Sequence, residues 1–174
     1  MKTVCVIGQW CTGKSYAIFE AAKWLWQKNS QFELTDVPFD KELYAGREYI
    51  GEYSDLRTLF FVNGKRILFY SATDNEDCIK GLKNTLTQLS LAHASPDILV
   101  TSCRRFDDKV QKTLLDGMKW HASNNLLFDN SGNEIIQIPV LRVRHELNSQ
   151  SVIEWYNSLT AHLLQKVLEM LIFN

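Results

Sequence analysis

Residues 2–15, KTVCVIGQWCTGKS, decide the fold of this chain, because they join an apolar segment to an amphipathic one through a turn bounded by two glycines. Residues 2–7 are a short apolar run rich in β-branched side chains, which predicts a buried strand. After the turn, residues 13–27 (GKSYAIFEAAKWLWQ) have the periodicity of a helix. The apolar face of this helix consists of Ile18, Ala21, Ala22 and Leu25.

Strands and helices are predicted to alternate along the rest of the chain. Asn63 and Gly64, the preferred pair for a type I′ turn, separate two apolar runs and predict an antiparallel hairpin. The later strands are expected at residues 57–62, 65–72, 97–103 and 134–143, and helices at about 75–92, at 107–122 and after Ser151. This alternation predicts a single three-layer α/β/α domain over residues 1–174, with about five or six mainly parallel strands and one antiparallel hairpin strand.

The closing helix is expected to begin near Ser151, which has the spacing of a capping box with Glu154. One face of this helix is lined by Val152, Tyr156, Leu159, Leu163 and Val167. Its last residues, 168–174 (LEMLIFN), leave apolar side chains at the end of the chain. Packing within the molecule is the simpler explanation of these residues, and a surface for a protein partner is the alternative.

Composition limits the classes of function. The formal net charge of -1 argues against non-specific binding of nucleic acid. No stretch approaches the ~20 apolar residues that a membrane-spanning helix needs. The four cysteines, Cys5, Cys11, Cys78 and Cys103, form no CxxC pair, which disfavours a disulfide scaffold or a zinc module. A reducing, cytoplasmic setting is therefore expected.

The turn at residues 8–15, GQWCTGKS, fits the pattern G-x-x-x-x-G-K-[ST] at every fixed position. Such a turn points successive backbone N–H groups at one anion, and the tight bend needs glycine at its two fixed points. The Lys14 ammonium suits the β- and γ-phosphates, and the Ser15 hydroxyl can bind Mg²⁺. The positive end of the following helix points to the same place. The candidate phosphate-binding residues are Gly8, Gln9, Trp10, Cys11, Thr12, Gly13, Lys14, Ser15 and Tyr16.

On this motif, and on the order of strands and helices around it, the sequence resembles the P-loop nucleoside triphosphatases. The resemblance implies that the chain binds ATP or GTP with Mg²⁺ and acts at the γ-phosphate, where Lys14 stabilises developing charge. Two residues of the turn are unusual. Trp10 either covers the nucleotide, blocks an arginine supplied by a partner, or packs outward. Cys11 is either a small filler or a thiol activated by Lys14.

A second acidic group is needed to hold magnesium, and Asp74 is the best candidate because it follows the strand ILFYSAT. Asp74 can also serve as the N-cap of the next helix, and the two roles are compatible. Glu76 either positions an attacking water molecule or is an exposed acid in the first turn of that helix. Ser15 and Asp74 are therefore the predicted metal ligands, and Glu76 is a catalytic candidate.

The order of elements is similar to that of the Ras-like small GTPases. It runs from a strand and the P-loop helix through a long polar segment to a hairpin and an acidic turn. On that resemblance Thr35, Ser54 and Thr58 compete as the switch hydroxyl that completes the Mg²⁺ shell. The chain departs from the family in two motifs. It has Thr73-Asp74-Asn75-Glu76 where the family has D-x-x-G, and neither later strand is followed by N-K-x-D. The choice between ATP and GTP therefore stays open.

Two other classes of function remain. An ATP-dependent kinase of small molecules or nucleotides would share this order of elements, and Arg104, which follows the strand DILVTSC, could stabilise the transferred charge. A P-loop protein that binds nucleotide or a protein partner without turnover is the third possibility. A hydrolase of the GTPase-like switch type is the first expectation, because the hairpin precedes the acidic turn.

Overall fold

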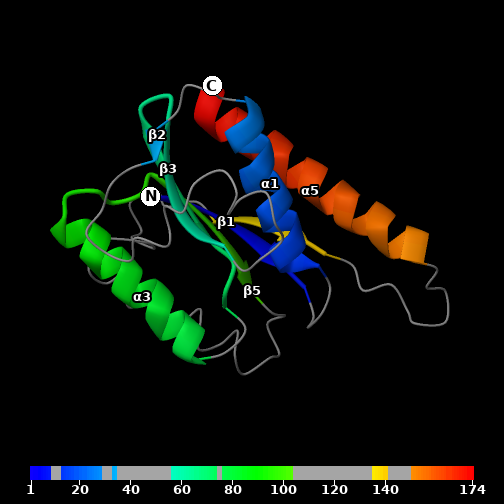
Figure 1. Ribbon diagram of the computed structural model, residues 1–174, viewed down its shortest axis with the longest axis horizontal. Helices are drawn as coiled ribbons and strands as arrows, with labels where there is room; N and C mark the ends of the chain where they lie inside the picture. The colour runs from blue at the N-terminus through cyan, green and yellow to red at the C-terminus, as the bar shows by residue number, and fades with distance from the viewer. Residues whose placement is uncertain (9–12, 29–32, 35–55, 74–75, 104–134, 141–149) are drawn as a thin grey trace.

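A computed structural model describes residues 1–8, 13–28, 33–34, 56–73, 76–103, 135–140 and 150–174. The described chain forms an α/β fold around one mixed sheet (Figure 1). Its strands are β1 Lys2–Ile7, β2 Glu33–Leu34, β3 Arg57–Val62, β4 Lys65–Tyr70, β5 Ile98–Cys103 and β6 Ile135–Pro139. Its helices are α1 Lys14–Lys28, α3 Glu76–Leu91 and α5 Gln150–Phe173.

The strands are arranged in the order β2-β3-β4-β5-β1-β6. Strand β1 is parallel to both of its neighbours, β5 and β6, and β4 is parallel to β5. Strand β3 is antiparallel to both β2 and β4. The sheet is therefore mainly parallel near β1 and antiparallel at the hairpin edge. Strand β5 lies between β1 and β4, so the strand that leads to Asp74 does not touch the strand that leads to the glycine-bounded turn.

The hairpin forms as its sequence predicts. Asn63 and Gly64 have φ angles of 50° and 75°, the left-handed conformation that a type I′ turn requires. The hairpin also contacts the far end of the chain. The Asn63 Nδ2 group donates to the carbonyl oxygen of Ile172 (2.8 Å), and the Lys65 Nζ group donates to that of Leu171 (2.7 Å). These contacts satisfy carbonyl groups that the end of α5 leaves without helical partners.

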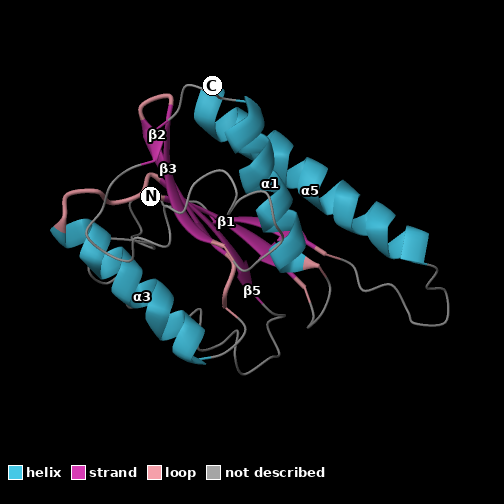
Figure 2. Cartoon of the chain, in the orientation of Figure 1, coloured by secondary structure: helices cyan, strands magenta, loops and turns pink. Residues whose placement is uncertain are grey.

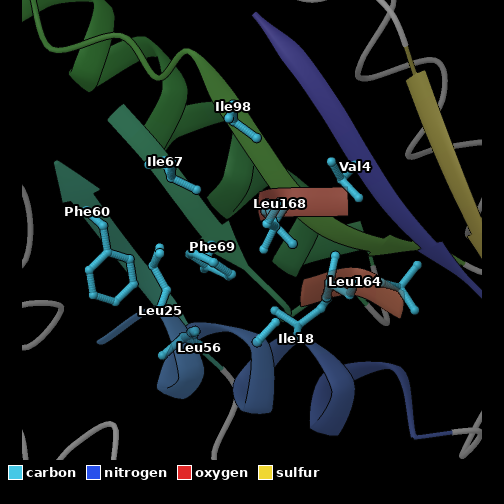
Figure 3. Packing of buried hydrophobic residues seen from close by; sticks show 14 of the residues in the cluster. Val4, Ile18, Leu25, Leu56, Phe60, Ile67, Phe69, Ile98, Leu164 and Leu168 are labelled. Atoms are coloured by element: carbon cyan, nitrogen blue, oxygen red, sulfur yellow. The ribbon is translucent and has the colours of Figure 1, made fainter. Parts of the chain in front are cut away.

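Helices cover both faces of the sheet. Figure 2 shows α1 and α5 side by side on one face and α3 on the other. The apolar residues predicted for α1 are all buried between this helix and the sheet. On α3, Ile79, Leu82, Leu86 and Leu89 are buried against the opposite face of the sheet. In the larger core, Ile18 and Leu25 of α1 and Leu164 of α5 meet side chains of the sheet such as Phe69 (Figure 3).

Most predicted elements are confirmed within the described residues, and one prediction needs correction. The last strand is described from Ile135 to Pro139, and residues 134 and 141–143 of the predicted strand lie outside the described residues. On α5, the predicted stripe is not the buried one, because Leu159 and Leu163 are exposed whereas Leu164 and Leu168 are fully buried. The predicted helix at 107–122 lies outside the described residues.

Within the part of the chain that the structure describes, none of the helices combines the length and the apolar character needed to span a membrane.

Candidate functional site

The predicted phosphate-binding turn begins where β1 ends, and its first residue is held by the neighbouring strand. The Gly8 N–H donates to the carbonyl oxygen of Cys103 at the end of β5 (3.1 Å). On the other side, the Val140 N–H donates to the carbonyl oxygen of Ile7 (2.6 Å). The start of the turn is thus tied to the carboxyl ends of both strands that flank β1, the edge where α/β folds usually bind ligands.

The turn ends at Gly13, whose φ of 79° is a conformation that side chains rarely adopt. The Gly13 carbonyl oxygen accepts the Ala17 N–H (2.9 Å), which starts the hydrogen bonding of α1. A second requirement for glycine comes from α5. A Cβ atom at residue 13 would overlap the Asn157 side chain, with Asn157 Cγ 2.8 Å away. Gly13 is therefore required both by its backbone angle and by the close approach of α5.

Lys14 is the first residue of α1 and is only 5% exposed. This position is unfavourable for a cation, because burial removes water from the ammonium group and the N-terminal end of the helix carries partial positive charge. An anion near this point would offset both effects. Ser15 and Tyr16, in the same turn of α1, are partly exposed.

Two thiols lie on β1 and β5, the strands that meet at the start of the turn, and they are on the face of the sheet that α3 covers. The Cys5 Sγ–H on β1 donates to Cys103 Sγ on β5 across 3.0 Å, and both residues are buried free cysteines. The hydrogen bond with Cys103 and the burial hold the pKa of Cys5 well above its usual range, and a Cys103 thiolate would raise it further. The Lys14 ammonium acts in the opposite direction and lowers the pKa of Cys5, so the lysine charge is felt at this sulfur.

Hydroxyl groups join the ends of β4 and β5. The Thr73 hydroxyl lies 2.7 Å from both the carbonyl and the hydroxyl oxygen of Ser102. The Ser102 hydroxyl is also 3.2 Å from the carbonyl oxygen of Ser71, and the Ser71 hydroxyl accepts the Leu56 N–H (2.7 Å). All three hydroxyl-bearing residues are buried. This network fixes the segment that leads from β4 toward Asp74 against the strand beside the turn.

The structure brings together part of the predicted site. Gly8, Gly13, Lys14, Ser15 and Tyr16 lie at the end of β1 and the start of α1. Six other predicted site residues lie outside the described residues: Gln9, Trp10, Cys11, Thr12, Asp74 and Arg104. Glu76 is the first residue of α3, but its side chain is also outside the described part.

Of the three predicted switch hydroxyls, Thr35 and Ser54 lie outside the described residues. Thr58 is buried in β3 and pairs with Phe69 of β4. Both β4 and β5 separate it from β1. Among the residues that the structure describes, no group of three His, Cys, Asp or Glu side chains is placed to hold a metal ion.

Asn157 is a residue of this site that the sequence analysis missed, although the sequence contains a signal for it. The face of α5 that packs on α1 and the sheet includes Ala161, Leu164 and Leu168. Asn157 precedes Ala161 by four residues and therefore lies on this face. A polar residue in line with a buried apolar stripe indicates a specific contact, which here is with Gly13.

Comparison of the chain with protein-family models, with curated proteins and with solved structures gives no match.

Proposed function

We propose that this chain is a Mg²⁺-dependent nucleoside triphosphate-binding protein that holds the phosphates in the turn at residues 8–15. The observation that carries the proposal is the placement of Lys14, a buried cation at the N-terminal end of α1, directly after a glycine with positive φ. A bound polyphosphate would be attracted by the lysine, by the helix and by the backbone N–H groups of the turn. The three-layer P-loop fold and a single domain over residues 1–174 are part of this proposal.

Hydrolysis of the γ-phosphate, in a GTPase-like switch protein, is the activity that we propose first. In this scheme Lys14 stabilises the charge that develops on the phosphates, and Ser15 is a ligand of Mg²⁺. Asp74 is the second proposed metal ligand and Glu76 the candidate that positions water. Because β5 separates the ends of β4 and β1, which places them about 10 Å apart, we expect Asp74 to reach the metal through a water molecule.

Arg104 is proposed as a further source of positive charge. It follows Cys103, whose carbonyl oxygen accepts the Gly8 N–H at the start of the turn. In a hydrolase it would stabilise the transition state, and in a kinase it would bind the transferred phosphate.

Binding without turnover is the second candidate function. The polar groups described at the ends of β4 and β5 include the hydroxyls of Thr73 and Ser102, which hydrogen-bond to each other, and that of Ser71, which accepts the Leu56 N–H. Such neutral, hydrogen-bonded groups are poor bases for activating water. Turnover would therefore depend on Asp74, Glu76 and Arg104, and without a contribution from them the chain would bind nucleotide without hydrolysing it. A cytoplasmic location fits either function, because Cys5, Cys78 and Cys103 are free thiols.

A thermal-shift titration tests the proposal. The native chain is heated with ATP, GTP and their diphosphates, each with and without Mg²⁺. A ligand at about one hundred times its dissociation constant stabilises the folded state by ~2.7 kcal/mol, which corresponds to a Tm increase of roughly 5–10 °C in a protein of this size. We expect this increase for at least one triphosphate with Mg²⁺.

Two variants and one assay complete the test. Lys14→Ala should abolish the shift, whereas Lys23→Ala, a change to a lysine further along α1, should keep it. Phosphate release then separates hydrolysis from binding alone. If Lys14→Ala keeps the full shift, the turn is not the phosphate site and the proposal is wrong.

A further inference from the structure

Helix α5 has two apolar faces, and the part of the chain that the structure describes covers one of them. The covered face packs against α1 and the sheet and includes Ala161, Leu164, Leu168 and Ile172. On the opposite side lies a row of large apolar side chains, which we call the outer stripe. Its members are Trp155 (60% exposed), Leu159 (49%), Leu163 (47%), Met170 (65%) and Phe173 (39%). Figure 1 shows α5 at the outside of the molecule, along α1.

The spacing of the outer stripe is that of a seam between helices. From Leu159 to Phe173 the positions advance by four, three, four and three residues, with Lys166 occupying the place between Leu163 and Met170. This alternation is the heptad pattern by which one helix packs along another. A helix that is apolar on both sides is typical of a helix buried on both sides. Among the described residues, α1 and the sheet cover one side of α5.

Charge does not oppose the burial of this stripe. Lys166 is the charged residue within it, and its Nζ group already lies 2.9 Å from Glu169 Oε2 of the same helix. The aliphatic part of a lysine side chain can cover apolar surface while its ammonium group stays at the edge. Two such stripes can therefore meet without unpaired charges between them.

The amount of exposed surface suits a dimer. The five side chains of the outer stripe together expose roughly 500 Å² on each chain, judged from the typical area of large side chains. A standard interface buries about 800 Å² on each partner, and such an interface includes a polar rim. Ser158 and His162 are exposed beside the stripe and are placed to contribute to that rim.

The order of residues in the stripe makes it complementary to a second copy of itself. When two such helices lie antiparallel, Trp155 of one copy meets Phe173 of the other, and Leu159 meets Met170. In the same register Leu163 meets the aliphatic part of Lys166. A two-fold axis needs this kind of self-complementary surface, because each contact must occur twice.

We propose that the outer stripe of α5 is the interface of a homodimer in which the α5 helices of two copies pack antiparallel. The 24-residue helix is about 36 Å long, which is enough for the contacts at both ends to form together. Trp155 is the largest side chain of the stripe and anchors each end of the interface against Phe173 of the second copy.

Sedimentation velocity on the full chain tests the dimer. The native chain should sediment with twice the mass of one chain at micromolar concentrations. Leu163→Lys should sediment as a single chain, because the new ammonium group would face Lys166 of the second copy. Trp155→Ala should weaken the dimer by about 30-fold or more, the effect expected of an interface anchor.

Leu91→Lys is the matched control, since Leu91 is an exposed leucine on α3, away from α5. It should leave the dimer unchanged. Circular dichroism of each variant checks that the fold is intact, which is expected because the substituted side chains are exposed. A native chain that stays monomeric at high micromolar concentration, or a Leu163→Lys variant that stays dimeric, overturns the proposal. So does binding of the stripe by a different protein while the native chain remains monomeric.

Discussion

At the scale of single residues, Gly13 combines two constraints that are usually found apart. Its positive φ disfavours any side chain, and the Asn157 side chain occupies the space where a Cβ atom would lie. Gly64 offers a comparison, since it has a φ of 75° but no atom within 4 Å of its Cβ position. Both glycines have a positive φ, but only at Gly13 does a neighbouring side chain occupy the place of a Cβ atom.

Gly13→Ala should therefore destabilise the protein more than Gly64→Ala. The backbone angle alone should cost about 1–2 kcal/mol in each variant. The overlap with Asn157 should add to the cost only at Gly13, and Asn157→Ala should remove that addition in the double variant. We expect a coupling energy of about 1 kcal/mol or more between residues 13 and 157, measured by urea unfolding of the four members of the cycle. If the two substitutions change the free energy of unfolding additively, the Asn157 side chain does not restrict residue 13.

Cys5 should make the stability of the protein depend on pH above neutrality. Its pKa is raised in the folded state by Cys103 and by burial, so the unfolded thiol ionises first, from about pH 8.5 upward. The stability that the neutral Cys5 thiol contributes is fully present below the pKa of the unfolded thiol. It is lost as the pH rises toward the pKa of the folded thiol. The free energy of unfolding should therefore fall by up to ~1.4 kcal/mol per pH unit in that range.

The measurement is urea unfolding between neutral and alkaline pH in the presence of a reductant. Cys5→Ala should have a smaller slope than the native chain. Equal slopes in the native chain and in Cys5→Ala would contradict the raised pKa of Cys5.

At the scale of elements, the β3-β4 hairpin does more than close the edge of the sheet. Through Asn63 and Lys65 it binds the last carbonyl groups of α5, where the helix has partial negative charge. The Lys65 Nζ group lies 2.7 Å from the carbonyl oxygen of Leu171 and 3.4 Å from that of Ile172. Two elements that are remote in the sequence are thus joined by one charged side chain.

Lys65→Met should lower the free energy of unfolding by about 1–2 kcal/mol, because the carbonyl groups lose a charged donor at the end of a helix. Lys80→Met is the matched control. Lys80 pairs with Asp77 on an exposed surface, and such pairs contribute about 0–1 kcal/mol. Equal losses in the two variants, measured by urea unfolding, would show that the contact with α5 contributes little.

Element identity could be predicted from the sequence because it depends on local patterns. The Asn63-Gly64 pair defines its own turn, and the apolar residues of α1 and α3 repeat at helical spacing. Helix α5 shows the limit of this reasoning. Apolar residues occur on both of its sides, so periodicity alone could not decide between Leu163 and Leu164 as the buried residue.

At the scale of the whole molecule, the order of strands was beyond the reach of local patterns. Alternation predicted a mainly parallel sheet with helices around it, and this is confirmed in the described residues. Strand β5 lies between β1 and β4, and this position depends on pairing between segments that are far apart in the chain. The strand ends near the turn therefore carry Cys103 and Ser102. Asp74 stays a predicted metal ligand, one strand further away.

The position of β1 between two strands that follow it in the sequence has a consequence for biosynthesis. Both of its neighbours, residues 98–103 and 135–139, are made long after β1 itself has left the ribosome. A nascent chain that ends before Ile98 has no β-strand partner for its first segment, so its buried side chains stay exposed and Gly8 lacks the carbonyl group that orients it. Translation must therefore pass residue 139 before the sheet can close around β1, and until then this apolar segment is open to aggregation.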